Sequence, residues 1–419
     1  MAENPAEQKD RELIYDWNLA GTPPPRPATP ITFDDETLRD GLQSPSVKDP
    51  PVEAKREILD RMAAIGIETA DLGLPGAGSE HQRDILELAR HIADEGLQIR
   101  PNVACRTVIA DIEPVREIMD RTGLSVLACC FIGSSPIRQY TEGWTLDTLL
   151  GHVEKSLSYA RDHDIPTMFV TEDTTRAHPD DVRALYELAI DLGAERVCIC
   201  DTCGHATPEG TRNVVAFVKE IVAAKGRPVG IDWHGHRDRN LDIANCIAAI
   251  EAGADRIHGA ALGVGERAGN APMDLVLANF KLLGWIDRDL SELGDYVRTC
   301  AGHLGVPIPH NYPIFGHDAF LTGTGVHAAA VIKALKKGDA WLADRVYSGV
   351  PAGLFGEKQR IAIGYMSGRS NVIYWLDTHG YDGRDEQLVA HVFGAAKQAD
   401  HLLTDEEVHA IVRAYAKST

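Results

Sequence analysis

The feature that most constrains the fold is an alternation of short β-branched runs with longer amphipathic runs, repeated from residue 30 to about residue 285. Eight short runs have strand character: "ITFDD", "IETADLG", "QIRPNVAC", "LSVLACCF", "PTMFVT", "ERVCIC", "PVGIDWH" and "DRIHGA". The stretches between them, such as "NLDIANCIAAIEAGAD", carry apolar residues at helical spacing. Eight repeats predict an α/β fold closed into a (β/α)8 TIM barrel. An open doubly wound sheet is the alternative, but no glycine fingerprint of a dinucleotide site follows the first strand.

Two segments flank the predicted barrel. Residues 1–29 are polar and end in "GTPPPRPATP", whose prolines predict an extended N-terminal arm. The barrel is expected over residues 30–290, and residues 291–419 are expected to form small, mostly helical C-terminal subdomains that serve as a lid and in dimerisation. Several of the eight cysteines lie in apolar runs such as "VLACCF", which indicates reduced core residues. "CICDTC" lacks the second CxxC of a structural zinc site.

Composition favours small-molecule chemistry. With 419 residues, 44% of them hydrophobic, the chain can fill a sizeable core. Its net charge of -20 disfavours nucleic-acid and membrane-surface partners, because both are polyanions that need basic patches. No apolar run reaches membrane-spanning length, and the N-terminus lacks the layout of a signal peptide. A cytoplasmic location is therefore expected.

Polar side chains follow each predicted strand. In a TIM barrel the C-terminal ends of the strands share one mouth, where the active site lies. In strand order the candidates are Arg39, Asp40 and Gln43; Asp71; Arg106; Ser134, Ser135 and Arg138; Glu172 and Arg176; Asp201 and Thr202; His234 and His236; and Glu266 and Asn270. Eight polar ends in succession exceed what solvated loops explain, because ordinary loops are rich in Lys, Ser and Gly.

The run "WHGH" carries the sharpest signal, a candidate metal site. Side chains two apart on a strand point the same way, so His234 and His236 can grip one ion together. Asp40 can add a carboxylate oxygen and Asn270 a carbonyl oxygen, because barrel closure brings the first and eighth strands together. This donor set suits a divalent cation (Mg, Mn, Zn or Co). Two histidines hydrogen-bonded at a loop are the alternative.

Five motifs together carry a family resemblance: "DETLRDGLQ", "TEDTTR", "DTCGHATP", "HGHRD" and "GVGERAGN". In order and spacing they resemble the DRE-TIM metallolyase superfamily, in particular its 2-isopropylmalate synthase and homocitrate synthase branch. The resemblance covers roughly residues 30–375 and continues through "NYPIFGHDAFLTGTGVHAAAVIKA", which looks like the C-terminal subdomains of those synthases.

The resemblance implies a Claisen-type condensation, in which acetyl-CoA loses a methyl proton and attacks the ketone of a 2-oxo acid, and hydrolysis of the thioester by water then releases CoA. Arg39 is placed to reinforce stabilisation of the developing alkoxide, while Glu172 and His327 resemble the acid/base pair, with Tyr347 assisting. In the family the equivalents of His327 and Tyr347 reach the partner's active site, which implies a domain-swapped homodimer. The alternative for Tyr347 is a surface aromatic in a lid. Candidate substrate-binding residues are Gln43, Arg106, Ser135, Arg138, Arg176 and Thr202.

Competing functions are a lyase and a metal-binding relic without activity. "RDGLQ" is similar to the turn of 3-hydroxy-3-methylglutaryl-CoA lyase, with Leu42 where the synthases usually carry Glu. "GVGERAGN", "SGRSNV" and His327 favour a synthase. Intact Arg39, Glu172 and His327 argue against a relic. Arg237, commonly Asn, and Asp71, frequently Glu, also depart from the family pattern. Because the sequence ends at residue 419, a leucine-sensing domain is not expected.

Arg138, in "IGSSPIRQYTEGW", bears on the second substrate. Homocitrate synthases resemble this chain in carrying Arg there, whereas isopropylmalate synthases tend to carry His. A guanidinium facing an isopropyl group would be desolvated without a partner, but facing a second anion it gains a charge-assisted contact. A 2-oxo acid with a second acidic group is therefore expected, and a monoanionic 2-oxo acid, as in 2-isopropylmalate or citramalate synthesis, is the alternative. Outward pairing of Arg138 with Glu142 or Asp147 would remove this argument.

Overall fold

A computed structural model describes residues 5–21, 26, 27 and 29–418. The chain forms two compact units. One unit is Leu19–Pro307, and the other joins the N-terminal residues up to Asn18 to the chain from Ile308 onward.

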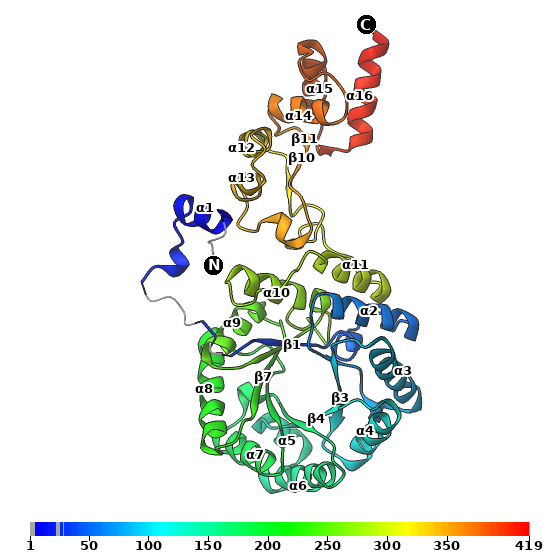
Figure 1. Cartoon of the computed structure of the whole chain (residues 1–419), viewed down its shortest axis with the longest axis vertical. Helices are drawn as coiled ribbons and strands as arrows, with labels where there is room; N and C mark the ends of the chain where they lie inside the picture. Colours follow the sequence, from blue (N-terminus) through cyan, green and yellow to red (C-terminus); the bar gives the residue numbers. More distant parts are fainter. Residues whose placement is uncertain (1–4, 22–25, 28, 419) are drawn as a thin grey trace. The chain divides into compact units, whose positions relative to one another are not determined.

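The larger unit is built around a closed barrel of eight parallel strands (Figure 1). The strands are β1 (Thr32–Asp35), β2 (Thr69–Asp71), β3 (Arg100–Arg106), β4 (Leu127–Gly133), β5 (Thr167–Glu172), β6 (Arg196–Asp201), β7 (Gly230–Gly235) and β8 (Arg256–Gly259). Pairing of β1 with both β2 and β8, in register from Thr32↔Arg256 to Asp35↔Gly259, closes the barrel. The predicted TIM barrel is thus confirmed, and the open sheet is wrong.

Helices surround the barrel on its outside (Figure 1). They are α2 (Val52–Ala64), α3 (Ser79–Glu95), α4 (Ile109–Thr122), α5 (Pro136–Glu142), α6 (Leu146–Asp162), α7 (Pro179–Asp191), α8 (Pro208–Ala224), α9 (Asp242–Ala252), α10 (Met273–Leu282) and α11 (Leu293–Leu304). Helix α8 illustrates how local sequence starts these helices. The Thr207 side chain accepts a hydrogen bond from the Gly210 backbone N–H at 3.2 Å, and Pro208 occupies the first helical position. Buried Val215, Val218 and Ile221 lie three residues apart and form its core-facing stripe.

The barrel interior carries ionic side chains where most TIM barrels pack branched apolar residues. Asp34 on β1 accepts from the Asn102 amide of β3 at 2.7 Å, and both side chains are buried. Asp232 on β7 pairs with Arg196 of β6 (2.5 Å) and with Arg256 of β8 (3.7 Å). Asp232 is therefore paired with arginines of both neighbouring strands, which offsets the desolvation of its charge.

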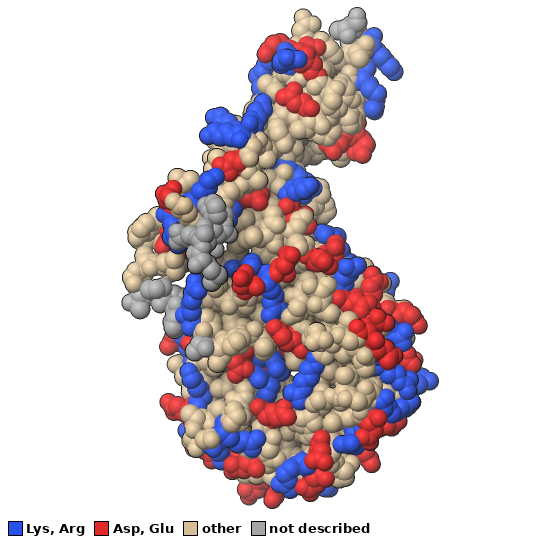
Figure 2. Space-filling view, in the orientation of Figure 1, with Lys and Arg blue, Asp and Glu red and all other residues tan. Residues whose placement is uncertain are grey.

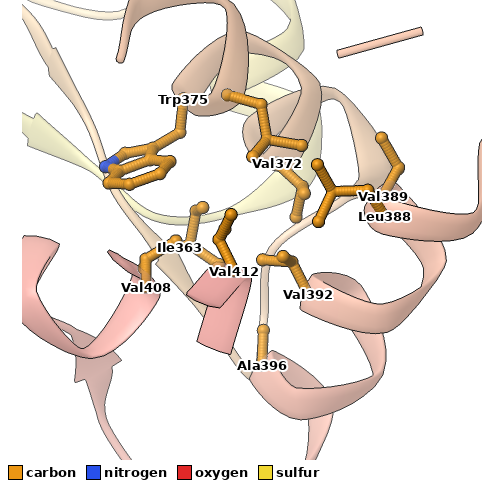
Figure 3. Close-up of a cluster of buried hydrophobic side chains, with 10 residues drawn as sticks. Ile363, Val372, Trp375, Leu388, Val389, Val392, Ala396, Val408 and Val412 are labelled. Atoms are coloured by element: carbon orange, nitrogen blue, oxygen red, sulfur yellow. The ribbon is translucent and has the colours of Figure 1, made fainter. Parts of the chain in front are cut away.

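The smaller unit is mostly helical, as the sequence predicts. Its helices are α1 (Pro5–Leu13), α12 (Gly325–Lys336), α13 (Ala340–Arg345), α14 (Arg369–Thr378), α15 (Glu386–Gln398) and α16 (Asp405–Ser418). Two small sheets pair β9 (Leu321–Thr322) with β10 (Arg360–Ile361) and β11 (Ile363–Gly364) with β12 (Leu402–Leu403). Figure 3 shows the core of α14–α16, where Val372, Val392 and Val412 point toward one another. Trp375 donates from its indole N–H to Asp405 at 2.7 Å, so its polar atom is satisfied at the edge of this core.

The N-terminal arm differs from the prediction of an extended segment. Residues Pro5–Leu13 form helix α1. Within the smaller unit, Lys9 pairs with Asp339 at 3.0 Å and Asp10 with Arg345 at 2.7 Å. These ion pairs connect α1 to α13. The prediction of an extended arm rested on the prolines further along the segment, and those give no information about residues 5–13. The proline run at 22–25 lies outside the described residues, and the domain limits at 30 and 290 stay predictions.

On the face of the barrel seen in Figure 2, blue Lys and Arg side chains lie among red Asp and Glu side chains.

In the described part of the chain, no helix is both long enough and apolar enough to cross a membrane. All eight cysteines are free, and seven of them are buried, as the sequence predicts.

Candidate active site

The C-terminal ends of the strands enclose a cavity of about 260 Å³. One part of its wall is charged or polar: Glu36, Arg39, Asp40, Gln43, Asp71, Glu172, Thr202, His234, His236, His258 and Glu266. The other part is apolar or thiol: Leu74, Ala104, Cys129, Phe131, Met168, Val170, Cys198 and Cys200. A lining that combines charged and apolar side chains suits a small substrate with both a polar and an apolar part.

The turn after β1 supplies the densest charge. Arg39 pairs with Glu36, with Asp71 through Nε at 3.1 Å and with Asp40 through Nη1 at 3.4 Å. Burial disfavours a cation here, yet these three carboxylates together raise the pKa of Arg39 well above its usual value. Gly41 follows at the start of a 3-10 turn (Gly41–Gln43), where an added Cβ would lie 3.0 Å from Val264. The charged turn therefore folds tightly against the loop after β8.

Three predicted metal ligands converge. His234 Nε2 lies 3.3 Å and His236 Nε2 3.5 Å from Asp40 Oδ2, and the two ring nitrogens are 3.4 Å apart. Ligand atoms bound at 2.0–2.2 Å to one divalent cation lie about 3–3.5 Å from one another, so this spacing fits. The other Asp40 oxygen accepts from the Glu266 backbone N–H at 3.3 Å, which leaves Oδ2 facing the histidines.

Asn270 completes the donor set. Its Nδ2 donates to the Val264 carbonyl at 3.0 Å, and its Oδ1 is buried without a hydrogen-bond partner in the structure. A buried, unpaired carbonyl oxygen is costly unless something binds it, so it supports a cation at this place. A β-bridge between Asn270 and His236 brings the amide beside the histidine strand.

Glycines shape the loop "GVGERAGN". Gly269 has φ +102°, and a Cβ there would lie 1.9 Å from the Gly263 carbonyl oxygen, so only glycine fits. Arg267 on the same loop pairs with Asp238 at 2.9 and 3.0 Å and also donates to the Thr202 carbonyl. The loop is thereby tied to the ends of β6 and β7.

A second donor group, which the strand-end pattern did not predict, lies beside the first. Glu36 Oε1 is 3.4 Å from His234 Nδ1 and 2.9 Å from His258 Nδ1. The alternation of side chains along β1 was the available signal, since Glu36 is two residues from buried Asp34 and points inward like it.

Glu172 and Arg138 form a pair, and Glu172 lines the cavity. Arg138 Nε lies 3.7 Å from Glu172 Oε1, while its Nη1 contacts Glu142 at 3.0 Å. Arg138 Nε is buried and lacks a hydrogen-bond partner in the structure. Ser135 caps α5 by accepting from the Arg138 backbone N–H at 3.4 Å. The predicted outward pairing with Glu142 thus exists, but it engages only one end of the guanidinium.

Two predicted substrate-binding arginines are held by neighbouring aspartates and do not line the cavity. Arg106 forms two hydrogen bonds of 2.8 Å with Asp111, and its side chain is 58% exposed. Arg176 binds Asp173 through Nε and Nη2 at 2.7–3.1 Å. Gln43 and Thr202, in contrast, do line the cavity.

His327 and Tyr347 belong to the smaller unit, as predicted, and lie outside the barrel. Their rings stack with centroids 4.1 Å apart. The same unit contains a further group of possible metal donors, His310, His317 and Asp318, all exposed.

Comparisons with known proteins agree with this architecture. The chain is 31% identical over 385 residues to "Homocitrate synthase AksA" of Methanopyrus kandleri, covering 90% of this chain and 91% of the relative. It is 32% identical over 384 residues to a "Probable 2-isopropylmalate synthase" of Ignicoccus hospitalis, covering 90% of each. Among solved structures, HMG-CoA lyase from Brucella melitensis matches with a TM-score of 0.53 at 18% identity, over 66% of this chain and 99% of that one. That likeness shows the barrel fold.

The fold and the site define a TIM barrel with a buried histidine–carboxylate–amide donor set at the C-terminal ends of its strands. The family model "HMGL-like" matches residues 30–297, which span the whole barrel. The chain belongs to the HMGL-like family.

Proposed function

We propose that this protein condenses acetyl-CoA with a 2-oxo acid and releases CoA. Relatives that match over about 90% of the chain are named homocitrate and 2-isopropylmalate synthases, and one matching over 90% of the chain is named (R)-citramalate synthase. The observation that carries the proposal is that the Asp40 carboxylate lies close both to the two histidines and to Arg39. One oxygen of this carboxylate, Oδ2, lies 3.3 and 3.5 Å from the two histidines and 3.4 Å from the Arg39 guanidinium.

A divalent cation fits the four donors Asp40, His234, His236 and Asn270, and when bound it would polarise the ketone of a chelating 2-oxo acid. Arg39 contributes a fixed positive charge next to this place, where negative charge develops on the ketone oxygen. Because three carboxylates hold its guanidinium, the charge is positioned before the substrate arrives.

Glu172 is the base within the barrel that takes the methyl proton of acetyl-CoA. Burial raises its pKa from the usual value, as do the carboxylates of Asp173, Glu266 and Glu142, while Arg138 opposes the rise. A carboxylate with a raised pKa is a stronger base than a solvated one, as removal of a weakly acidic proton requires. His327 and Tyr347 are proposed to complete the acid/base set from the partner of a homodimer.

The second substrate carries a further acidic group, as in 2-oxoglutarate, oxaloacetate or a phosphonate analogue of pyruvate. Arg138 Nε is buried without a hydrogen-bond partner, 3.7 Å from Glu172 of the cavity wall, and this supports the assignment. The apolar wall around Met168 and Val170 favours the second candidate, a monoanionic 2-oxo acid such as 2-oxoisovalerate or pyruvate.

A panel of 2-oxo acids with acetyl-CoA tests the proposal, read by the release of free thiol and by the mass of the product. We expect thiol release that requires both substrates. Cleavage of 3-hydroxy-3-methylglutaryl-CoA without any condensation would contradict the proposal and indicate a lyase.

A further inference from the structure

Glu36 lines the cavity and occupies a central position in its charge network. Its Oε2 binds the Arg39 guanidinium, and its Oε1 faces His258 Nδ1 at 2.9 Å and His234 Nδ1 at 3.4 Å. The side chain is buried, with 3% of the residue exposed. One carboxylate thus contacts the proposed oxyanion-stabilising arginine and a proposed metal ligand together.

The two histidines of the proposed metal site differ in the contacts of their Nδ1 atoms. His234 presents Nε2 to Asp40 and Nδ1 to Glu36, whereas His236 presents Nε2 to Asp40 but has a buried Nδ1 without a hydrogen-bond partner. A carboxylate behind a metal-bound imidazole holds the ring's orientation and its tautomer. In this site only His234 has that support among the described residues.

His258 contacts the same oxygen of Glu36 that faces His234. Its Nε2 lies 2.9 Å from Asp232 and 3.5 Å from Asp34, so both ring nitrogens face carboxylates. Burial lowers the pKa of this imidazole, but the carboxylates of Asp34, Asp232 and Glu36 outweigh burial and raise it to about 9. Asp232 is in turn held by Arg196 at 2.5 Å.

We propose that Glu36 is a positioning residue that links the two halves of the active site: it orients the His234 ring so that Nε2 faces the cation, and it holds Arg39 beside the same place. His258, anchored on Asp232, keeps Glu36 where it reaches both. This inference rests on the proposed function for the identity of the cation site, but it concerns contacts of the protein's own residues. It predicts that metal affinity depends on a residue that does not touch the metal.

Metal affinity in the absence of substrate provides the test. The dissociation constant for Co²⁺ is measured by competition with a chromophoric chelator, together with the Co²⁺ absorption spectrum and the number of ions per chain. We expect the wild-type chain to bind one Co²⁺ ion. In Glu36→Gln the affinity for this ion should fall about 10- to 100-fold. Glu36→Asp keeps the acceptor and should recover part of the loss.

A matched control is Glu251→Gln on α9, since Glu251 also accepts from an arginine, Arg212, at 2.7 and 3.1 Å but lies outside the cavity wall. Its Co²⁺ affinity should stay within about twofold of wild type. If Glu36→Gln does not fold, His258→Gln measures the same coupling and should also weaken Co²⁺ binding.

Unchanged Co²⁺ affinity in a folded Glu36→Gln protein overturns the inference even if condensation activity is found. Two ions per wild-type chain, one of them lost in Glu36→Gln, also overturns it, because Glu36 would then be a ligand together with His234 and His258. Weakened Co²⁺ binding in a protein that condenses no 2-oxo acid supports the inference while the proposed function fails.

Discussion

The imidazole of His327 stacks on the phenol of Tyr347, with ring centroids 4.1 Å apart and ring planes inclined by 29°. His327 lies on α12 and Tyr347 follows α13, so two helices of the smaller unit present one aromatic pair. Tyr347 is about half exposed, and Val326, next to His327, is largely exposed. The pair therefore lies at the surface of the smaller unit.

Complementation tests whether that pair acts on a partner's barrel. Glu172→Gln and His327→Ala should each be nearly inactive alone, because each removes one proposed acid/base group. Mixed after dissociation and reassociation, they should regain up to about a quarter of wild-type activity, since a mixed dimer of this kind contains one intact site. Mixing Glu172→Gln with Arg39→Ala, both in the barrel, is the control and should restore nothing. A fully active monomer would refute the shared site.

Removal of the metal should abolish turnover. Chelator treatment followed by return of a divalent cation should remove and restore thiol release, because the donor atoms of Asp40, His234 and His236 match a cation's spacing. His234→Ala should lower the metal content per chain and reduce activity at least 100-fold. His303→Ala, a partly exposed histidine paired with Glu57, should change neither quantity. Full activity with no detectable metal would exclude this site.

Arg138 should set the preference between substrates. Loss of a charge-assisted contact of roughly 1.5–3 kcal/mol corresponds to a fall of about 10- to 150-fold in kcat/KM for a dianionic 2-oxo acid in Arg138→Ala. The value for 2-oxoisovalerate should change little. Arg116→Ala on the outer face of α4, where Arg116 pairs with Asp120, is the control. Preference of the wild type for 2-oxoisovalerate would make the monoanionic alternative correct.

The pH dependence of kcat/KM should report Glu172. Its raised pKa, caused by burial and by the carboxylates of Asp173, Glu266 and Glu142 against the opposing Arg138, places the acidic limb above the ordinary range of a glutamate. Since the base must be deprotonated, activity should fall as the pH drops through that pKa. Arg138→Ala removes the group that lowers the pKa, so the limb should move to higher pH. A shift to lower pH would show that another group controls the limb.

The sequence predicts most of the fold because the barrel repeats one local pattern eight times. Each of the eight predicted runs forms a strand, and closure follows from β1 pairing with β8. Helix α1 could not be predicted in the same way. Its residues are strongly polar, and the observed contacts of Lys9 with Asp339 and of Asp10 with Arg345 span more than 300 positions of sequence.

Site residues could be predicted from the sequence where they directly follow a strand. They could not be predicted where their role depends on a contact with a residue far away in the sequence. Asp40, His234 and His236 converge because strand ends in a barrel share one mouth. The contact of Glu36 with His258 joins residues 222 positions apart, and an inward carboxylate directly after β1 has no evident role without that imidazole. Arg106 shows the converse case, because its strand position predicts that it faces the cavity, whereas its guanidinium binds Asp111, five residues further on.

Tyr296 on α11 offers a test of how the barrel is stabilised at β1. Its buried hydroxyl donates to Asp35, which also accepts from the Thr37 backbone N–H at 2.9 Å. Burial raises the pKa of Asp35 to about 7, although these hydrogen bonds oppose the rise. Because the folded state then binds more protons than the unfolded state, this group's contribution to stability decreases as the pH rises from about 4 to about 7.

Tyr296→Phe removes one hydrogen bond to the buried carboxylate and should lower the free energy of unfolding by about 1–3 kcal/mol. Without the hydroxyl the pKa of Asp35 rises further, so the loss should be larger at pH 8, where the wild-type carboxylate is ionised, than at pH 5. Urea unfolding of both proteins at the two pH values measures this difference. Tyr140→Phe on α5, where the tyrosine is 90% exposed, is the control and should leave stability within about 0.5 kcal/mol. An equal loss at pH 5 and pH 8 would mean that Tyr296 contributes packing alone and does not stabilise the charged form of Asp35.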